Sequence, residues 1–312
     1  MLGLRVFEDH TPEAGPRQGG ADALFPDPLQ LCHPAAPALP VVLASPHSGR
    51  LYPLEFLAAS KLDAVGIRRS EDAFIDELLW PAHERGCPLL AANFPRAYLD
   101  VNREPFELDP AMFADPLPAH MNTRSLRVTS GLGTIARIVR EGVEIYRRKL
   151  TVAEAERRIR ALYIPYHDTL ARLLEETHAH FGCAVLIDVH SMPSLPPMSA
   201  MADLRADIVL GDRFGAACHP EIIRAAEAVF RRLGYRVKRN QPYAGGFSTE
   251  HYGRPRLGFH ALQIEINRAL YMDEERIERR PRAMAILGAH MAEAVEAIGT
   301  TELNALRASS AA

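Results

Sequence analysis

Short apolar runs bounded by turn residues recur along the chain, and they predict the strands of a buried sheet. The clearest run is Ala184–Ile187, which leads into Asp188 and His190 before Pro193 ends any regular structure. Further strands are expected at Leu39–Ala44, Pro88–Phe94, Ala206–Leu210, Tyr235–Lys238 and His260–Ile266. Because strands buried on both faces show continuous apolar runs, the pattern favours a parallel sheet.

Segments with apolar residues at helical spacing separate these strands, and they predict amphipathic helices. The expected helices are Ser70–Trp80 with Ser70 as N-cap, Thr151–Phe181 with a capping box and a kink at Pro165, Pro220–Gly234, and Asp273–Ile298. Strands that alternate with helices indicate the α/β class. Residues 1–22 are polar and rich in Gly and Pro, so we expect a flexible tail, followed by a single domain over residues 23–312.

Composition and charge narrow the class of protein further. The chain is 47% hydrophobic and 24% charged, and its formal net charge of −3 gives no electrostatic footprint for nucleic acid or an anionic membrane. A membrane-spanning helix would need about 18 consecutive apolar residues, and the sequence contains no such run. The cysteines form no Cys-x-x-Cys pair, so we interpret them as small apolar residues of the core. This use of cysteine is typical of a protein in a reducing compartment. We therefore expect a soluble, cytoplasmic protein.

Two of the predicted strands end in the same way. Leu39–Ala44 runs into Ser45-Pro46-His47-Ser48-Gly49, and the later strand runs into Val189-His190-Ser191. If these strands are parallel, both imidazoles lie at one edge of the sheet, where the polar residues of open α/β sheets perform their chemistry. Since Asp188 and His190 are two residues apart, they share one face of their strand.

Carboxylates accompany the two histidines at the predicted site. Glu265 lies on an apolar strand with Gln263 on the same face, and a charged side chain there is costly unless it is paired or functional. Glu71 and Asp72 lie at a predicted helix start, where they can also serve the helix dipole. Two imidazoles and one carboxylate would leave a fourth position of Zn²⁺ open for water, as in catalytic sites. The remaining carboxylate would be the general base, while Asp188 either orients His190 or caps backbone N–H groups.

Four motifs together resemble the N-formylglutamate amidohydrolase family. They are Ser45-Pro46-His47-Ser48-Gly49, Asp100-Val101-Asn102-Arg103, Asp188-Val189-His190-Ser191-Met192-Pro193 and Gln263-Ile264-Glu265-Ile266-Asn267-Arg268. The resemblance implies a three-layer α/β/α domain with a mixed, largely parallel sheet like that of zinc carboxypeptidases and aspartoacylase. It further implies one catalytic zinc ion and hydrolysis of an N-formyl amino acid to formate and the free amino acid, in histidine breakdown for the type member.

The resemblance also assigns roles to individual residues. It implies that His47 and His190 are zinc ligands, that Asp72 is the acidic ligand with Glu71 left open as the alternative, and that Glu265 is the base. Arg96 resembles the arginine that polarises the scissile carbonyl. Asn102 and Arg103 resemble the pair that holds the substrate carboxylate.

One loop departs from the family pattern. Where the loop before Gly-Gly is basic in the type enzymes, this chain has Pro242-Tyr243-Ala244-Gly245-Gly246. We expect Tyr243, Gly245 and Gly246 to contact the substrate side chain, so the preference for the γ-carboxylate of N-formylglutamate stays open.

The alternatives are a carboxypeptidase-like or aspartoacylase-like enzyme acting on another N-acyl amino acid or a peptide, and a non-enzymatic amino-acid-binding or zinc-binding protein. Mn²⁺, Co²⁺ or Fe²⁺ could replace zinc on the same ligands. The oligomeric state is left open.

Overall fold

The computed structural model describes residues 24–140, 142–194 and 205–301. By the density of backbone contacts the chain divides into two compact units. The first unit holds the residues up to Gln30, Gly49–Glu71 and Ala92–Ala171; the second holds Leu31–Ser48, Asp72–Ala91 and the residues from Arg172 onward. The N-terminal tail expected over residues 1–22 lies outside the described residues, and a single domain over residues 23–312 stays a prediction.

The large sheet has seven strands in the order β1-β3-β2-β6-β9-β7-β8. Their bounds are β1 Leu29–Cys32, β2 Val41–Ser45, β3 Leu89–Ala92, β6 Ala184–Met192, β7 Ile208–Gly211, β8 Val237–Arg239 and β9 Phe259–Asn267. β2 pairs in parallel with β3 and β6, β6 pairs in parallel with β9, and β7 pairs in parallel with β8. β7 is antiparallel to β9, so the expectation of a mixed, largely parallel sheet is confirmed.

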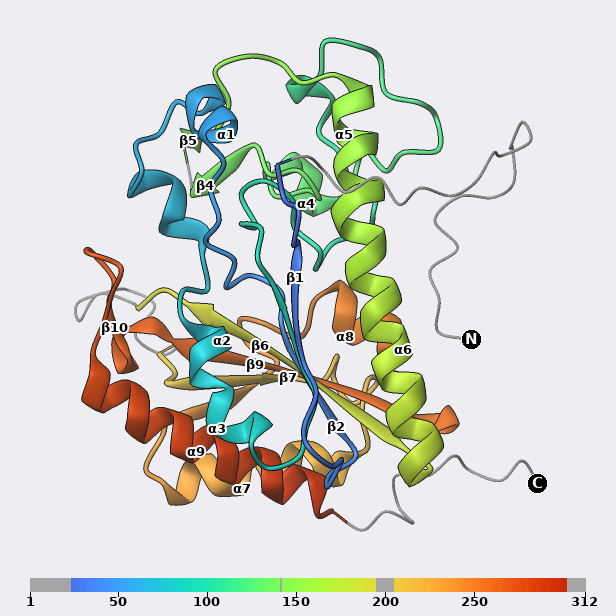
Figure 1. Ribbon diagram of the computed structural model, residues 1–312, viewed down its shortest axis with the longest axis vertical. Helices are drawn as coiled ribbons and strands as arrows, with labels where there is room; N and C mark the ends of the chain where they lie inside the picture. The colour runs from blue at the N-terminus through green and yellow to red at the C-terminus, as the bar shows by residue number, and fades with distance from the viewer. Residues whose placement is uncertain (1–23, 141, 195–204, 302–312) are drawn as a thin grey trace. The chain divides into compact units, whose positions relative to one another are not determined.

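One face of this sheet forms the apolar core of the second unit. The inward residues of the central strands alternate along each strand, as Val185, Ile187 and Val189 do on β6. They pack with buried residues of α2 (Ile75–Leu78), α3 (Trp80–His83), α7 (Pro220–Arg232) and α9 (Pro281–Gly299), and α7 and α9 lie side by side below the strands in Figure 1. Within the part of the chain that the structure describes, no helix is both long enough and apolar enough to cross a bilayer.

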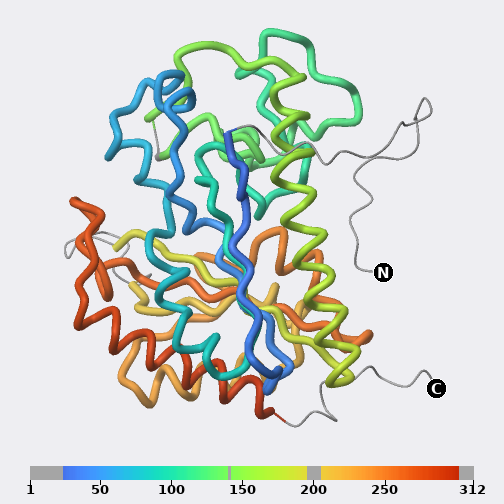
Figure 2. The backbone as a smooth tube through the Cα atoms, in the orientation of Figure 1, coloured from blue at the N-terminus to red at the C-terminus, as the bar shows by residue number. Residues whose placement is uncertain are grey.

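The opposite face of the central strands carries the polar residues. In the parallel register of β6 and β9, Asp188 lies opposite Gln263 and His190 lies opposite Glu265. The tube in Figure 2 shows these two strands running together through the middle of the second unit. Since alternate residues of each strand fill the apolar core on the other face, all four polar side chains point to the same side of the sheet.

The first unit is built from shorter elements. They are α1 Leu54–Ala59, a 3₁₀ turn at Gly66–Ser70, another at Pro110–Met112, α4 Leu126–Thr129, the hairpin β4 Ile138–Arg140 with β5 Val143–Glu144, and α5 Val152–Arg158. The predicted capping box is present, because Thr151 and Glu154 exchange side-chain-to-backbone hydrogen bonds. A π-helical turn at Ile159–Tyr163 precedes α6 (Ile164–Phe181), where Pro165 lacks the N–H for a regular helical bond.

Several element predictions are wrong in extent. No helix begins at Ser70: a 3₁₀ turn ends there, and α2 begins only at Ile75, after Phe74 in a left-handed conformation. The last helix begins at Pro281, because β10 Met272–Asp273 and β11 Glu278–Arg279 pair as a hairpin before it. The loop Pro242–Gly246 is followed directly by α8, which spans Phe247–Tyr252.

Candidate active site

Two histidines and one aspartate converge at the edge of the large sheet. His47 lies in the turn after β2, and His190 lies near the end of β6, which runs parallel to β2. Asp72 Oδ2 is 3.2 Å from His47 Nδ1 and 3.1 Å from His190 Nδ1, and the two ring nitrogens are 3.1 Å apart. All three residues are buried. The expectation that the parallel strands bring both imidazoles together is therefore met.

These three atoms have the chemistry and the spacing of a metal-ligand set. Nitrogen, nitrogen and oxygen ligands at about 2.0–2.2 Å from a tetrahedral ion would be about 3.3 Å apart, close to the separations observed. A single proton can bridge only two of three mutually contacting acceptors, whereas a cation serves all three at once. Among the described residues this is the group of His, Cys, Asp and Glu side chains that could hold an ion.

The second oxygen of Asp72 is held by groups that the sequence did not single out. Ser191 donates to Asp72 Oδ1 at 3.0 Å, and Arg268 Nη2 donates to the same oxygen at 3.3 Å. Arg268 Nε also donates to Ser191 Oγ at 2.9 Å, so the three side chains form a closed buried network. Such hydrogen bonds fix which oxygen of a ligating carboxylate faces the metal. Both residues lie within the quoted motifs, but only the fold reveals that they meet at Asp72.

Asp188 orients His190, one of the two roles that the sequence left open. Asp188 Oδ2 lies 2.9 Å from His190 Nε2, so the other ring nitrogen, Nδ1, faces the ligand group. Burial alone would lower the pKa of His190, but Asp188, Asp72 and Glu265 outweigh it and hold this pKa well above its usual value. The surroundings of His190 thus favour a positive charge, either a proton or a metal ion.

The local fold separates the neighbours Glu71 and Asp72. The Asp72 N–H donates to the His47 carbonyl at 3.0 Å. This bond holds Asp72 against the turn after β2, and residue 72 is not part of a helix. Glu71 accepts two hydrogen bonds from Arg68, at 2.8 Å and 3.1 Å, and lies outside the ligand group. Its carboxylate therefore neutralises a guanidinium, and the geometry favours Asp72 as the acidic ligand.

Glu265 lies beside His190 on the neighbouring strand and is held by the chain of contacts around it. Gln263 Nε2 donates to Glu265 Oε1 at 2.9 Å, and Gln263 Oε1 accepts from the Gly246 N–H at 2.7 Å. Glu265 is 8% exposed and Gln263 is 4% exposed. The predicted base is thus a nearly buried carboxylate that does not belong to the ligand group.

The loop of Tyr243, Gly245 and Gly246 approaches the sheet closely. A Cβ on Gly211, at the end of β7, would come within 2.7 Å of the Ala244 carbonyl carbon, and Gly245 has a φ of +116° that favours glycine. The Gly246 N–H donates to Gln263 Oε1, whereas the Tyr243 side chain is 39% exposed. The two glycines therefore set the backbone against the sheet, and Tyr243 is accessible to a ligand.

Arg96, Asn102 and Arg103 are gathered around Asp100 in the first unit. Asp100 Oδ2 accepts from Arg96 Nη2 at 2.8 Å and lies 3.5 Å from Arg103 Nη2, while Asp100 Oδ1 accepts from the Asn102 N–H. Arg103 also donates to the carbonyls of Asn102 and Leu132. Burial lowers the pKa of Arg103, partly offset by Asp100, although a guanidinium stays charged throughout the physiological range.

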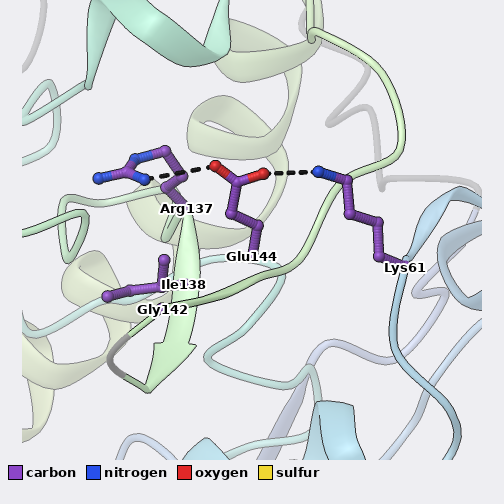
Figure 3. Close-up of a pocket in the computed structure, with 5 residues that line it drawn as sticks. All are labelled: Lys61, Arg137, Ile138, Gly142 and Glu144. Carbon is purple, nitrogen blue, oxygen red and sulfur yellow. Dashed lines mark hydrogen bonds and ion pairs between the residues drawn. The ribbon is translucent and has the colours of Figure 1, made fainter.

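A surface pocket of about 480 Å³ in the first unit has no catalytic constellation. Lys61, Arg137, Ile138, Gly142 and Glu144 line it. Figure 3 shows Glu144 between two cations, at 2.5 Å from Lys61 Nζ and 3.5 Å from Arg137 Nη1. Arg137 Nε also donates to Asp109 Oδ2 at 2.8 Å, so the two cations of this pocket are already paired with two carboxylates.

A mixed, largely parallel α/β sheet, a buried His-Asp-His group that could hold a metal ion and a carboxylate beside it together form the arrangement found in metal-dependent hydrolases. Comparison with known proteins agrees. The model of the N-formylglutamate amidohydrolase family matches residues 39–272. N-formylglutamate deformylase of Pseudomonas aeruginosa is 32% identical over 76% of this chain and 84% of its own length; that of Pseudomonas putida is 30% identical over 76% and 83%.

A solved structure supports the same assignment. The crystal structure of N-formylglutamate amidohydrolase from Ralstonia eutropha superposes with a TM-score of 0.76 at 37% identity, covering 86% of this chain and 98% of that one. The chain belongs to the N-formylglutamate amidohydrolase family, as its motifs suggested. The predictions of family, α/β fold and amidohydrolase activity are confirmed.

Proposed function

We propose that the protein hydrolyses the formamide bond of N-formylglutamate, consuming water and giving formate and glutamate. The observation that carries the proposal is the buried triangle of His47, Asp72 and His190 with Glu265 on the neighbouring strand. The two curated relatives are named for the same reaction.

The metal in this proposal is one Zn²⁺ per chain, held by His47 Nδ1, Asp72 Oδ2 and His190 Nδ1. When bound, such an ion lowers the pKa of water from 15.7 to about 7 and polarises a carbonyl. Another divalent ion on the same ligands remains an alternative within the proposal, since nitrogen and carboxylate donors also accept Mn²⁺, Co²⁺ or Fe²⁺.

Glu265 is the proposed general base and, later, the general acid. Its carboxylate would take a proton from the attacking water and deliver it to the amine nitrogen as the C–N bond breaks. Water and the formamide thereby become formate and an ammonium group, with every proton accounted for. The position of Glu265 outside the ligand group supports this division of roles.

Substrate recognition is assigned by the family resemblance. Arg96 is proposed to stabilise the developing oxyanion, and Asn102 with Arg103 to bind the α-carboxylate. Tyr243, Gly245 and Gly246 are proposed to contact the side chain of the substrate. The exposure of Tyr243 and the absence of a basic residue in Pro242–Gly246 make the side-chain preference the open part of the proposal.

Release of glutamate from a panel of N-acyl glutamates tests the reaction. The metal-loaded protein is expected to prefer N-formylglutamate over its N-acetyl and N-succinyl analogues. Preference for one of the analogues would favour the deacylase alternative. Glu265→Gln should keep its metal and lose about 10²–10⁴-fold in kcat. Metal and substrate binding without turnover in the unaltered protein would favour the non-enzymatic alternative.

The carboxylate-binding role of Arg103 has its own test. Arg103→Lys keeps the charge but loses the planar fork, so KM should rise much more than kcat falls. The α-amide of N-formylglutamate should be a correspondingly poor substrate of the unaltered enzyme. Equal hydrolysis of the acid and the amide would exclude this role.

A cytoplasmic location and a small-molecule substrate as the main partner complete the proposal. No disulfide joins the four cysteines, all of which lie in the described part of the chain, and this supports a reducing compartment.

A further inference from the structure

We infer that Gln263 is a positioning residue that fixes Glu265 and couples it to the loop ending at Gly246. This inference rests on the proposed function, because it assigns Gln263 a role through the proposed base. It begins with a question of orientation. The two ends of an amide side chain differ only in which is donor and which is acceptor, so the partners decide the orientation.

The backbone settles that question for Gln263. The Gly246 N–H can only donate, and it lies 2.7 Å from Gln263 Oε1. The amide oxygen is therefore committed to the loop, and the NH₂ group is committed to Glu265, whose Oε1 lies 2.9 Å away. Gln263 is 4% exposed, so a flipped amide would set its NH₂ group against a buried N–H donor, which is unfavourable.

The two hydrogen bonds of Gln263 connect the Pro242–Gly246 loop with the carboxylate of Glu265. Gly246 precedes α8, and Gly245 adopts a left-handed conformation in which a Cβ would lie 2.9 Å from Thr249. Gly211 leaves the loop backbone room to lie against β7. Movement of the Pro242–Gly246 segment would therefore pull on the hydrogen bond that sets Gln263, and through it on the carboxylate of Glu265.

This arrangement gives Gln263 a function that packing alone would not require. An apolar residue of similar size would fill the same volume on this face of β9 without making either hydrogen bond. The amide instead donates to one oxygen of Glu265 and so fixes the direction of its carboxylate. It also allows the loop proposed to contact the substrate side chain to influence the proposed base.

Two variants of similar length separate the two bonds of Gln263. Gln263→Met removes both, and Gln263→Glu keeps an acceptor for Gly246 while it replaces the donor facing Glu265 by an oxygen. We expect kcat for N-formylglutamate to fall roughly 10–100-fold in both, the range for groups that orient active-site residues. KM should change much less, and metal content measured by atomic emission should stay at the level of the unaltered enzyme. Normal kcat in Gln263→Glu, with loss only in Gln263→Met, would overturn the inference, because the bond to Glu265 would then be dispensable.

A double-mutant cycle tests whether Gln263 acts through Glu265. In the Glu265→Gln background, Gln263→Met is expected to cause no further loss of kcat. An equal fold-loss in both backgrounds, or loss of metal from Gln263→Met, would assign Gln263 a different role and overturn the inference. If Glu265→Gln is impaired while Gln263→Met turns over normally, only the inference fails. Normal turnover of Glu265→Gln would refute the proposed base and the inference together.

Discussion

Asp72 illustrates how one side chain can face two environments at once. Its Oδ2 faces the two histidines, while its Oδ1 is bound by Ser191 and Arg268. A buried carboxylate without partners is strongly disfavoured, so the guanidinium of Arg268 compensates its charge on the side away from the histidines. This division leaves one oxygen to ligate and fixes its direction.

Substitution of the two adjacent acids gives opposite expectations for metal binding. Asp72→Asn should lose most of its metal, because a neutral amide is a poor ligand and does not balance the positive charge of the ion. Glu71→Gln should retain about one ion per chain. It should instead lower thermal stability, since the buried partner of Arg68 loses its charge. Atomic emission after dialysis measures both proteins under the same conditions. Retention by Asp72→Asn together with loss from Glu71→Gln would assign the ligand to Glu71.

At the scale of elements, the apolar strands were predictable and the segments between them were less so. Continuous apolar runs locate β2, β6 and β9, and the parallel register then brings His47 and His190 together. By local preference, Glu71 and Asp72 fit the first turn of a helix as well as they fit a ligand position. Glu71 is instead extended, and the Asp72 N–H donates to the His47 carbonyl, a tertiary contact with no local signal. The roles of Ser191, Gln263 and Arg268 likewise depend on which side chains meet in space.

The close approach of the Pro242–Gly246 loop to β7 predicts the effect of one added methyl group. In Gly211→Ala the Cβ would meet backbone atoms of Ala244 and Gly245 at 2.7–2.8 Å, so the loop must shift. We expect kcat/KM for N-formylglutamate to fall about 10–100-fold, as misplaced substrate-positioning groups do, with metal content unchanged. Adding Ala244→Gly should not restore activity, because the clash is with the backbone. Unchanged kcat/KM in Gly211→Ala would show that this approach has no catalytic role.

At the scale of the whole molecule, the sheet assembles the site from distant parts of the sequence. His47 and Asp72 are 25 residues apart, and Asp72 and His190 are 118 apart. The apolar face of the same strands packs on α7 and α9, so core and site are opposite faces of one sheet. Folding of the second unit is thus a condition for the ligand group to exist. An ion bound only to the folded state stabilises the protein by mass action, about 2.7 kcal/mol at a free concentration of 100 times Kd.

The buried thiols make stability depend on alkaline pH in a predictable direction. Burial raises the pKa of Cys87 to about 12, whereas an unfolded cysteine has a pKa of about 8.5. Between these values the unfolded chain releases a proton that the folded chain retains, so the free energy of unfolding falls as pH rises. The stabilising contribution of the protonated Cys87 thiol is fully present below about pH 8.5. Between pH 8 and pH 10 the free energy of unfolding falls by about 2 kcal/mol through this thiol.

Urea unfolding in a phosphine reductant at pH 8 and pH 10 measures this loss. In Cys87→Ala the decrease between the two pH values should be smaller by about 2 kcal/mol, whatever the substitution does to stability at pH 8. The unaltered protein, unfolded in the same buffers at the same two pH values, provides the control. An identical decrease in Cys87→Ala and the unaltered protein would mean that the Cys87 thiol titrates alike in the folded and unfolded chains. That result would contradict its complete burial beside β3, where an ionised thiolate would have no compensating charge.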